Sequence, residues 1–186
     1  MLITRTNVRI IIPRKVTGID FHKYNTTALE DWISSWYISR NFQYPADLNI
    51  KFIAKRYDIF IDYKPVESRY IRFGLYKEIV LNSNLHKFTQ REHFFHELCH
   101  AVRHAGKQTM MPKAFRQLQE RDAKYFTLYA ALPYHMIKRY NLNDPDLLEK
   151  WREDFNVSYH LCKSRLEQIH RRSFFVPIML KSHIKI

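Results

Sequence analysis

The pattern of apolar and polar residues first takes the period of an α-helix near residue 27. Thr27-Ala28-Leu29-Glu30 has the form of a capping box, which satisfies the first backbone N–H groups of a helix. The apolar stripe behind it recurs at helical spacing and consists of Leu29, Trp32, Ile33, Trp36 and Tyr37. A following helix is predicted to begin at Pro45, with Leu48, Ile53 and Tyr57 facing inward.

Three short runs then alternate between apolar and polar residues, which is the period of a β-strand. These runs cover residues 59–63, 70–73 and 77–81. Gly74 lies between the last two runs and predicts a tight hairpin, because glycine adopts positive φ at little cost. We expect a small antiparallel sheet.

Two longer helices are predicted after the strands. Thr89-Gln90-Arg91-Glu92 fits a second capping box, which predicts a helix that starts at Gln90 and stops at Gly106. The next helix runs from Pro112, a residue favoured in a first turn, to Pro133. Its predicted core face consists of Phe115, Leu118, Phe126, Tyr129 and Leu132.

The last part of the chain is predicted to be a pair of helices joined by a turn at residues 156–158. Asp144-Pro145 provides a cap and first turn. The apolar faces consist of Leu147, Leu148, Trp151 and Phe155, then of Tyr159, Cys162, Leu166 and Ile169. The pair resembles a helix-turn-helix, whose base-reading candidates would be His160, Lys163, Arg165 and Gln168. We favour the commoner alternative, a pair that packs on a core.

Composition limits the function further. The chain of 186 residues is 46% hydrophobic with only three glycines, which fits a compact, helix-rich domain. No stretch approaches the roughly 20 apolar residues of a membrane-spanning helix, and residues 1–9 lack the apolar core of a signal peptide. Cys99 and Cys162 provide no disulfide framework. We therefore expect a cytoplasmic protein with no membrane partner.

The chain is strongly basic, with 31 lysines and arginines against 18 acids and a net charge of +13. Such a charge favours acidic partners, nucleic acid among them. The basic residues are nevertheless spread along the chain, and the densest group lies between Lys163 and Arg172. A solvated basic surface is therefore favoured over a DNA-binding groove, and direct nucleic-acid binding remains the less favoured alternative.

The segment His96-Glu97-Leu98-Cys99-His100 carries the strongest chemical signal. Residues at i and i+4 lie on one face of a helix, so His96 and His100 would direct two imidazoles at one point, a spacing that suits zinc. Glu97 beside the first ligand is the candidate general base for a water molecule. A third ligand is expected on the following helix from Glu120 or Asp122, and spacing alone does not choose between them.

These motifs together resemble the ImmA/IrrE family of bacterial metallopeptidases. The resemblance rests on the H-E-x-x-H helix and on residues 120–126, an acid pair followed by Ala123 and Phe126, which lead to Pro133. Residues 79–82, 151–158 and 165–166 also resemble the family, so that residues 46–170 are covered. The resemblance implies that Glu120 is the third zinc ligand and Asp122 a supporting acid.

Two residues depart from the usual family pattern. Phe95 stands where the family usually has alanine, and Cys99 stands where it usually has glycine. Cysteine is small and apolar enough to replace glycine in close packing, and neither change removes a ligand. His104 is expected to lie behind the ligands or in the cleft. His93 could be a cleft residue or a partly exposed helix residue, and we favour the second.

The expected fold is therefore an α+β zincin-like domain. Residues 1–142 would form the metallopeptidase domain with its N-terminal helices, residues 143–172 the C-terminal helix pair packed on it or appended to it, and residues 173–186 a tail. The cleft would lie between the edge of the sheet and the zinc helix, where an exposed strand could bind an extended substrate.

The expected function is zinc-dependent peptide hydrolysis with Zn²⁺ as cofactor. The resemblance narrows the substrate to a specific intracellular protein, a DNA-binding helix-turn-helix repressor of a phage, a mobile element or a stress regulon. The alternative is a zinc-containing regulatory module, antitoxin-like or DNA-associated, that binds without proteolysis. An intact Glu97 favours the enzyme, because a pure binding protein has no chemical need for a base beside the metal.

Overall fold

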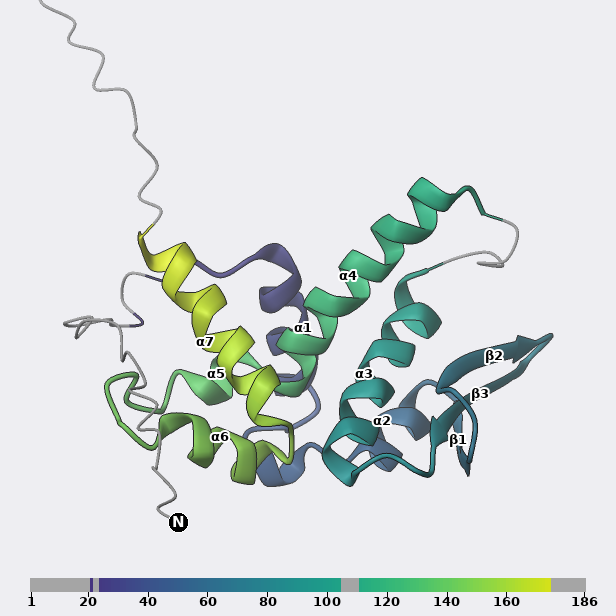
Figure 1. The fold of residues 1–186 in the computed structure, drawn as a ribbon, viewed down its shortest axis with the longest axis horizontal. Coiled ribbons are helices and arrows are strands. Elements are labelled where there is room, and N and C mark those ends of the chain that lie inside the picture. Colours follow the sequence, from purple (N-terminus) through teal and green to yellow (C-terminus); the bar gives the residue numbers. More distant parts are fainter. Residues whose placement is uncertain (1–20, 22–23, 105–110, 175–186) are drawn as a thin grey trace, which may run out of the picture.

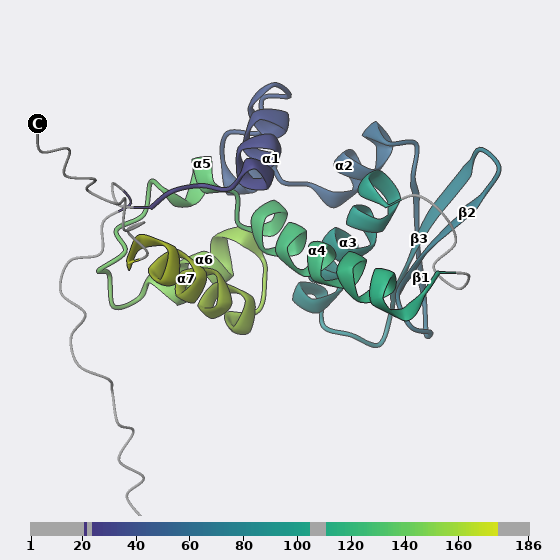
Figure 2. The same cartoon turned by 90° about the horizontal axis from the view of Figure 1, so that it is seen from above.

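A computed structural model describes residues 21, 24–104 and 111–174, and it has the mixed α+β architecture that the sequence predicts. Its elements are α1 (Ala28–Ile38), the 3-10 turn η2 (Pro45–Asp47), α2 (Ile50–Arg56), β1 (Phe60–Lys64), β2 (Arg69–Phe73), β3 (Tyr76–Asn82), α3 (Lys87–Arg103), α4 (Lys113–Ala131), α5 (Tyr134–Ile137), α6 (Leu147–Phe155) and α7 (Tyr159–Phe174). Helices α3 and α4 run side by side in the middle of the molecule (Figure 2). The sheet lies on one side of the α3–α4 pair, next to α3. Helices α5, α6 and α7 lie on the opposite side of the pair (Figures 1 and 2).

The sheet has three strands in the order β1-β3-β2 and is mixed. The expectation of a purely antiparallel sheet is correct for the β2–β3 hairpin and wrong for β1, which pairs with β3 in parallel. Gly74 at the hairpin turn has a φ of 58°, as predicted. Strand β3 takes the centre because it is the most apolar of the three: Ile79, Val80 and Leu81 are all buried. Alternation of residue types identifies a strand but not its neighbours.

The N-terminal helices follow the apolar pattern with two differences. The Thr27–Glu30 capping box forms as predicted, but Trp32 lies on the exposed side of α1. The second helix begins at Ile50 instead of Pro45, because the Asn49 side chain accepts hydrogen bonds from the first N–H groups of α2.

The two central helices differ from the prediction in different ways: α3 in its first residue, and α4 in the exposure of its first turns. Helix α3 starts one turn early, at Lys87, and His86 accepts a hydrogen bond from the Phe88 N–H; the predicted cap at Thr89 is therefore wrong. Its predicted stop, Gly106, lies outside the described residues. In α4, Phe115 and Leu118 are 51% and 48% exposed, so they do not belong to the core face. The reason is that the first turns of α4 project beyond the packed helices (Figure 1), while Phe126, Tyr129 and Leu132 are buried as predicted.

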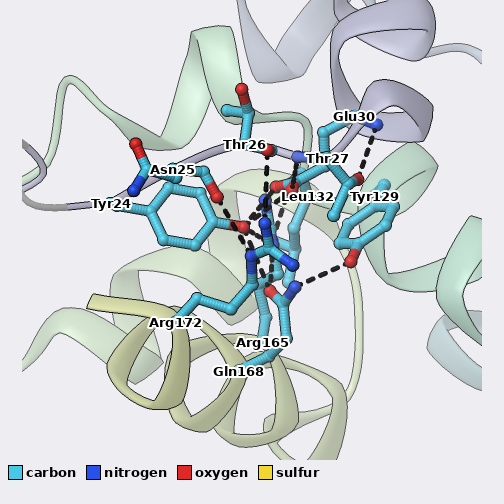
Figure 3. A network of polar contacts seen from close by, with 10 residues as sticks. All are labelled: Tyr24, Asn25, Thr26, Thr27, Glu30, Tyr129, Leu132, Arg165, Gln168 and Arg172. Atoms are coloured by element: carbon cyan, nitrogen blue, oxygen red, sulfur yellow. Dashed lines mark hydrogen bonds and ion pairs between the residues drawn. The ribbon is translucent and has the colours of Figure 1, made fainter. Parts of the chain in front are cut away.

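The C-terminal helix pair packs on the rest of the chain through a buried polar cluster, which we call the core network. The Arg165 guanidinium is fully buried and donates to Glu30 Oε1 at 2.5 Å. It also donates to Gln168 and to the Tyr24 hydroxyl, while Gln168 donates to the Tyr129 hydroxyl at 2.7 Å (Figure 3). This network joins α1, α4 and α7, segments that lie far apart in the sequence.

Helix α6 begins at Leu147, after Asp146, so the predicted start at Asp144-Pro145 is two residues too early. Asp144 instead accepts a hydrogen bond from the Asp146 N–H in the turn before the helix. Among the described helices, none is long and apolar enough to cross a membrane. The segments 1–9 and 175–186 lie outside the described residues, and the domain boundaries at residues 142 and 172 stay predictions.

Candidate metal centre

The three predicted ligands come together between α3 and α4. His96 and His100 occupy successive turns of α3, and Glu120 faces them from α4. The His96 and His100 Nε2 atoms lie 3.2 Å apart. Glu120 places Oε2 3.2 Å from His96 Nε2 and Oε1 3.4 Å from His100 Nε2. The two imidazole nitrogens thus face each other and the two oxygens of one carboxylate, and one ligand atom from each of the three side chains lies within 4.8 Å of the others.

The donor set and its spacing fit a tetrahedral metal ion. Ligand atoms at about 2.0–2.1 Å from zinc are separated by roughly 3.3 Å along the edge of a tetrahedron. Two imidazole nitrogens and one carboxylate oxygen are a ligand set that zinc takes at catalytic sites, where the fourth position stays open. Burial lowers the pKa of both His96 and His100, the latter to about 4 with help from the neighbouring His96, so both rings keep the lone pair that binds metal.

A chain of hydrogen bonds continues from His100 away from the proposed ligand point. His100 Nδ1 lies 2.8 Å from His104 Nδ1, and His104 Nε2 lies 3.0 Å from Asp122 Oδ2. One assignment of protons satisfies the whole chain: His104 donates from Nε2 to the carboxylate, and His100 donates from Nδ1 to His104. His100 Nε2 then keeps its lone pair directed at His96 and Glu120. A ligating histidine normally has such a partner on its other nitrogen.

Asp122 therefore lies behind the ligands and not among them. Its carboxylate accepts hydrogen bonds from Arg103 Nε at 2.9 Å and from the Cys99 thiol at 3.7 Å. Burial alone would raise the pKa of Asp122, but the hydrogen bonds from Arg103 and His104 lower it overall. Cys99 is fully buried where α3 packs on α4, a position that accepts only a small side chain. The structure thus separates the two acids that spacing could not, placing Glu120 with the histidines and Asp122 behind them.

Glu97 is held beside this centre by the edge of the sheet. The Tyr70 N–H of strand β2 donates to Glu97 Oε2 at 2.8 Å. Burial raises the pKa of Glu97 to about 7, the Tyr70 N–H acts against this, and the negative charge of Glu120 adds to it. The sequence identified Glu97 but not this backbone contact, since a strand N–H leaves no signal in a sequence.

A cleft of about 590 Å³ opens in front of His96 and Glu97. Its walls come from the segment before β2 and from α3, α4 and α7. The lining residues are Glu67, Ser68, Glu92, His93, His96, Glu97, Lys124, Thr127, Leu128, His160, Leu161 and Ser164. His93 lies in the cleft with Nδ1 2.9 Å from Ser68 Oγ, which agrees with the first of the two roles expected for it.

The first turn of α7 forms one wall of the cleft because α3 holds it in place. Glu92 Oε1 accepts a hydrogen bond from the Ser158 N–H, and Ser158 Oγ accepts one from the Leu161 N–H. Glu92 was expected to cap its own helix; it instead caps α7, which sequence analysis did not detect because the two segments are 66 residues apart.

The interpretation of α7 as a DNA-reading helix loses two of its four candidates. Arg165 and Gln168 are buried in the core network and are not exposed to a groove of DNA. His160 lines the cleft and Lys163 remains on the surface. The structure therefore supports packing on a core for this pair.

Comparison with known proteins agrees with this geometry. Residues 54–167 match the family model described as the IrrE N-terminal-like domain, a peptidase family. The uncharacterized protein YqaB of Bacillus subtilis is 30% identical over 152 residues, which cover 81% of this chain and 88% of that protein. The phage-like element PBSX protein XkdA of the same organism is also 30% identical over 152 residues, covering 77% of this chain and 74% of that protein. No solved structure was found to match.

Proposed function

Because the chain belongs to the peptidase family of the IrrE N-terminal-like domain, as its resemblance to ImmA/IrrE proteins predicted, we propose that it is a zinc-dependent endopeptidase. One observation carries the proposal: His96, His100 and Glu120 bring their ligand atoms together, with each imidazole Nε2 3.2–3.4 Å from the other or from a Glu120 oxygen, beside Glu97 and at a cleft. The chemistry proposed is hydrolysis of a peptide bond.

A zinc ion held by His96, His100 and Glu120 would supply Lewis acidity, which would polarise the scissile carbonyl and make a water molecule more acidic. Glu97 takes a proton from the attacking water and delivers it to the leaving amine. The Tyr70 N–H holds one oxygen of Glu97 and so fixes the direction of the other. His104 and Asp122 keep His100 in one tautomer and one orientation.

We further propose that the substrate is a specific protein, a DNA-binding helix-turn-helix repressor. The support is that one relative, XkdA, is a protein of a phage-like element, together with the family assignment. Repressors have linkers between domains, and a linker can enter a cleft of this size as an extended chain. Pairing with the exposed edge strand β2 would align such a chain beside Glu97.

The test is co-expression with a helix-turn-helix repressor taken from a neighbouring gene. We expect a single discrete cut in the repressor, which a zinc chelator abolishes and which Glu97→Gln prevents without unfolding the protein. Casein should be cut poorly. Rapid, unselective digestion of casein with the repressor untouched would contradict the proposed substrate. A Glu97→Gln variant that still inactivates the repressor in full would favour the regulatory binding module instead.

A further inference from the structure

The cleft needs a group that stabilises the negative charge on the carbonyl oxygen during hydrolysis. Tyr125 and Tyr129 are the tyrosines that the sequence offers nearest to the ligands, but they line a different hollow on α4. That hollow also contains Asp122, Gln168 and Arg171, none of which faces the cleft. The stabilising group must therefore be found among the residues that line the cleft itself.

Lys124 is the only lysine or arginine among the described residues that line the cleft. It follows the ligand Glu120 by four residues on α4, so the two side chains leave the helix on the same face. Lys124 and the proposed ligand His96 line the same cleft, together with Glu97. Lys124 is exposed, and no ion pair holds it to an acid of the described residues.

Apart from the proposed ligand His96, five other cleft residues could donate a hydrogen bond: His93, His160, Ser68, Thr127 and Ser164. His93 Nδ1 and Ser68 Oγ lie 2.9 Å apart and engage each other, and the Thr127 hydroxyl donates to the Ala123 carbonyl. His160 and Ser164 belong to α7, which carries none of the proposed ligands. None of the five offers an ammonium group as Lys124 does.

We propose that Lys124 is a catalytic residue whose ammonium donates to the carbonyl oxygen of the scissile bond; this rests on the proposed peptidase function. As the water oxygen bonds to the carbonyl carbon, the π electrons move to the carbonyl oxygen and Glu97 takes a proton. Lys124 stabilises that oxygen's negative charge without giving up its own proton. When the carbon–nitrogen bond breaks, the carbonyl re-forms and Glu97 returns its proton to the amine.

The experiment compares Lys124→Met and Lys124→Arg in the zinc-loaded full chain. The substrate is the best-cut member of a random pool of fluorogenic decapeptides. For Lys124→Met we expect kcat to fall about 10²-fold, the lower end of what loss of one such donor costs, with KM changed less than about threefold. In Lys124→Arg, kcat should be about tenfold higher than in Lys124→Met. Arginine keeps the positive charge but carries it on a side chain of different length.

A second readout does not depend on turnover. A phosphinic peptide carries a tetrahedral anionic group in place of the scissile bond, and its affinity is measured by calorimetry. Its Kd should rise about 10²-fold in Lys124→Met, because the group mimics the oxygen that Lys124 contacts. Lys113→Met is the matched control, since Lys113 is an exposed lysine of α4 that does not line the cleft, and it should leave kcat, KM and Kd unchanged.

Several outcomes would overturn the assignment of Lys124. An unchanged kcat and an unchanged Kd for the phosphinic peptide would do so, as would a loss confined to KM. Loss of zinc from Lys124→Met would show a structural role through Glu120 instead. A full loss in His160→Gln with none in Lys124→Met would move the role to α7. If the wild-type chain cuts no peptide, the proposed function fails, and the phosphinic titration still decides whether Lys124 contacts an anionic tetrahedral group.

Discussion

The core network around Arg165 and the cluster around Glu120 are both groups of polar side chains that join different helices, but one is closed and the other is open. In the core network, Arg165 and Glu30 are fully buried and the donors of Arg165 end on acceptors inside the network. In the metal centre, three ligand atoms from His96, His100 and Glu120 converge on one point, and Glu120 is 44% exposed towards solvent.

This difference distinguishes a structural polar cluster from the cluster that we propose binds a metal ion. A buried charge pair contributes little net stability, but removing one partner is costly because the other is left unpaired. Such a cluster therefore joins α1 to α7 without any chemistry to perform. In the open cluster, His100 donates from Nδ1 to His104, and His104 donates to the Asp122 carboxylate, so the lone pair of His100 Nε2 stays directed at His96 and Glu120. Substitutions in each of the two clusters test this difference.

The largest expected effect is on the rate of cleavage alone, and it comes from a substitution beside the open cluster. Glu97→Gln keeps the shape of the side chain and all three ligands. We expect repressor cleavage to fall by about 10²–10⁴-fold, the usual contribution of general acid–base catalysis. Zinc content and Tm should match the wild type, and a clear drop in Tm would mean that Glu97 is a structural residue like Glu30.

On the closed side, Arg165→Ala should act on stability. It leaves the Glu30 carboxylate buried without its cation, which costs about 3–5 kcal/mol of the free energy of unfolding. Urea unfolding measures this cost. The double variant Glu30→Met/Arg165→Met should recover part of it, because no unpaired charge remains. A cost of less than about 1 kcal/mol for Arg165→Ala would show that the network does not join the helices.

An intermediate effect is expected at His104, the hydrogen-bond partner of the proposed ligand His100. His104→Ala removes the acceptor for His100 Nδ1 and leaves every ligand in place. The affinity for zinc should fall about 10- to 100-fold, as for other partners of metal ligands, and competition with a chelator measures it. Unaltered affinity would mean that His100 is oriented by packing alone.

The smallest effect is expected at the cap of α1, beside the core network. Thr27→Ala removes the hydrogen bond from the Glu30 N–H to the threonine hydroxyl. The free energy of unfolding should fall by about 1 kcal/mol, and zinc affinity should stay unchanged. A change in zinc affinity would show that the two clusters are coupled.

The two clusters also differ in how well the sequence predicts them. His96, Glu97 and His100 lie within five residues on one helix, so their spacing reports their geometry directly. The core network joins residues such as Glu30 and Arg165, which are 135 positions apart. Arg165 and Gln168 were even possible surface residues by sequence, because nothing local distinguishes a buried arginine from a solvated one.

The fold shows a similar division, although three local predictions, the helix starts at Pro45, Thr89 and Asp144, were also misplaced. The Thr27–Glu30 capping box and the Gly74 turn depend on neighbouring residues and were predicted correctly. Parallel pairing of β1 with β3 and the capping of α7 by Glu92 depend on distant segments and were missed. Glu120 lies between these cases. Helical spacing alone left Glu120 and Asp122 as equal candidates for the third ligand, and the packing of α4 on α3 places Glu120 with His96 and His100.

The metal content of purified variants tests the central account most directly. We expect about one zinc per wild-type chain, since the three side chains form one set of ligands. His96→Ala, His100→Ala and Glu120→Ala should each lower the zinc content sharply, whereas Asp122→Ala should keep most of it. Loss of zinc in Asp122→Ala together with full retention in Glu120→Ala would contradict the proposed metal centre.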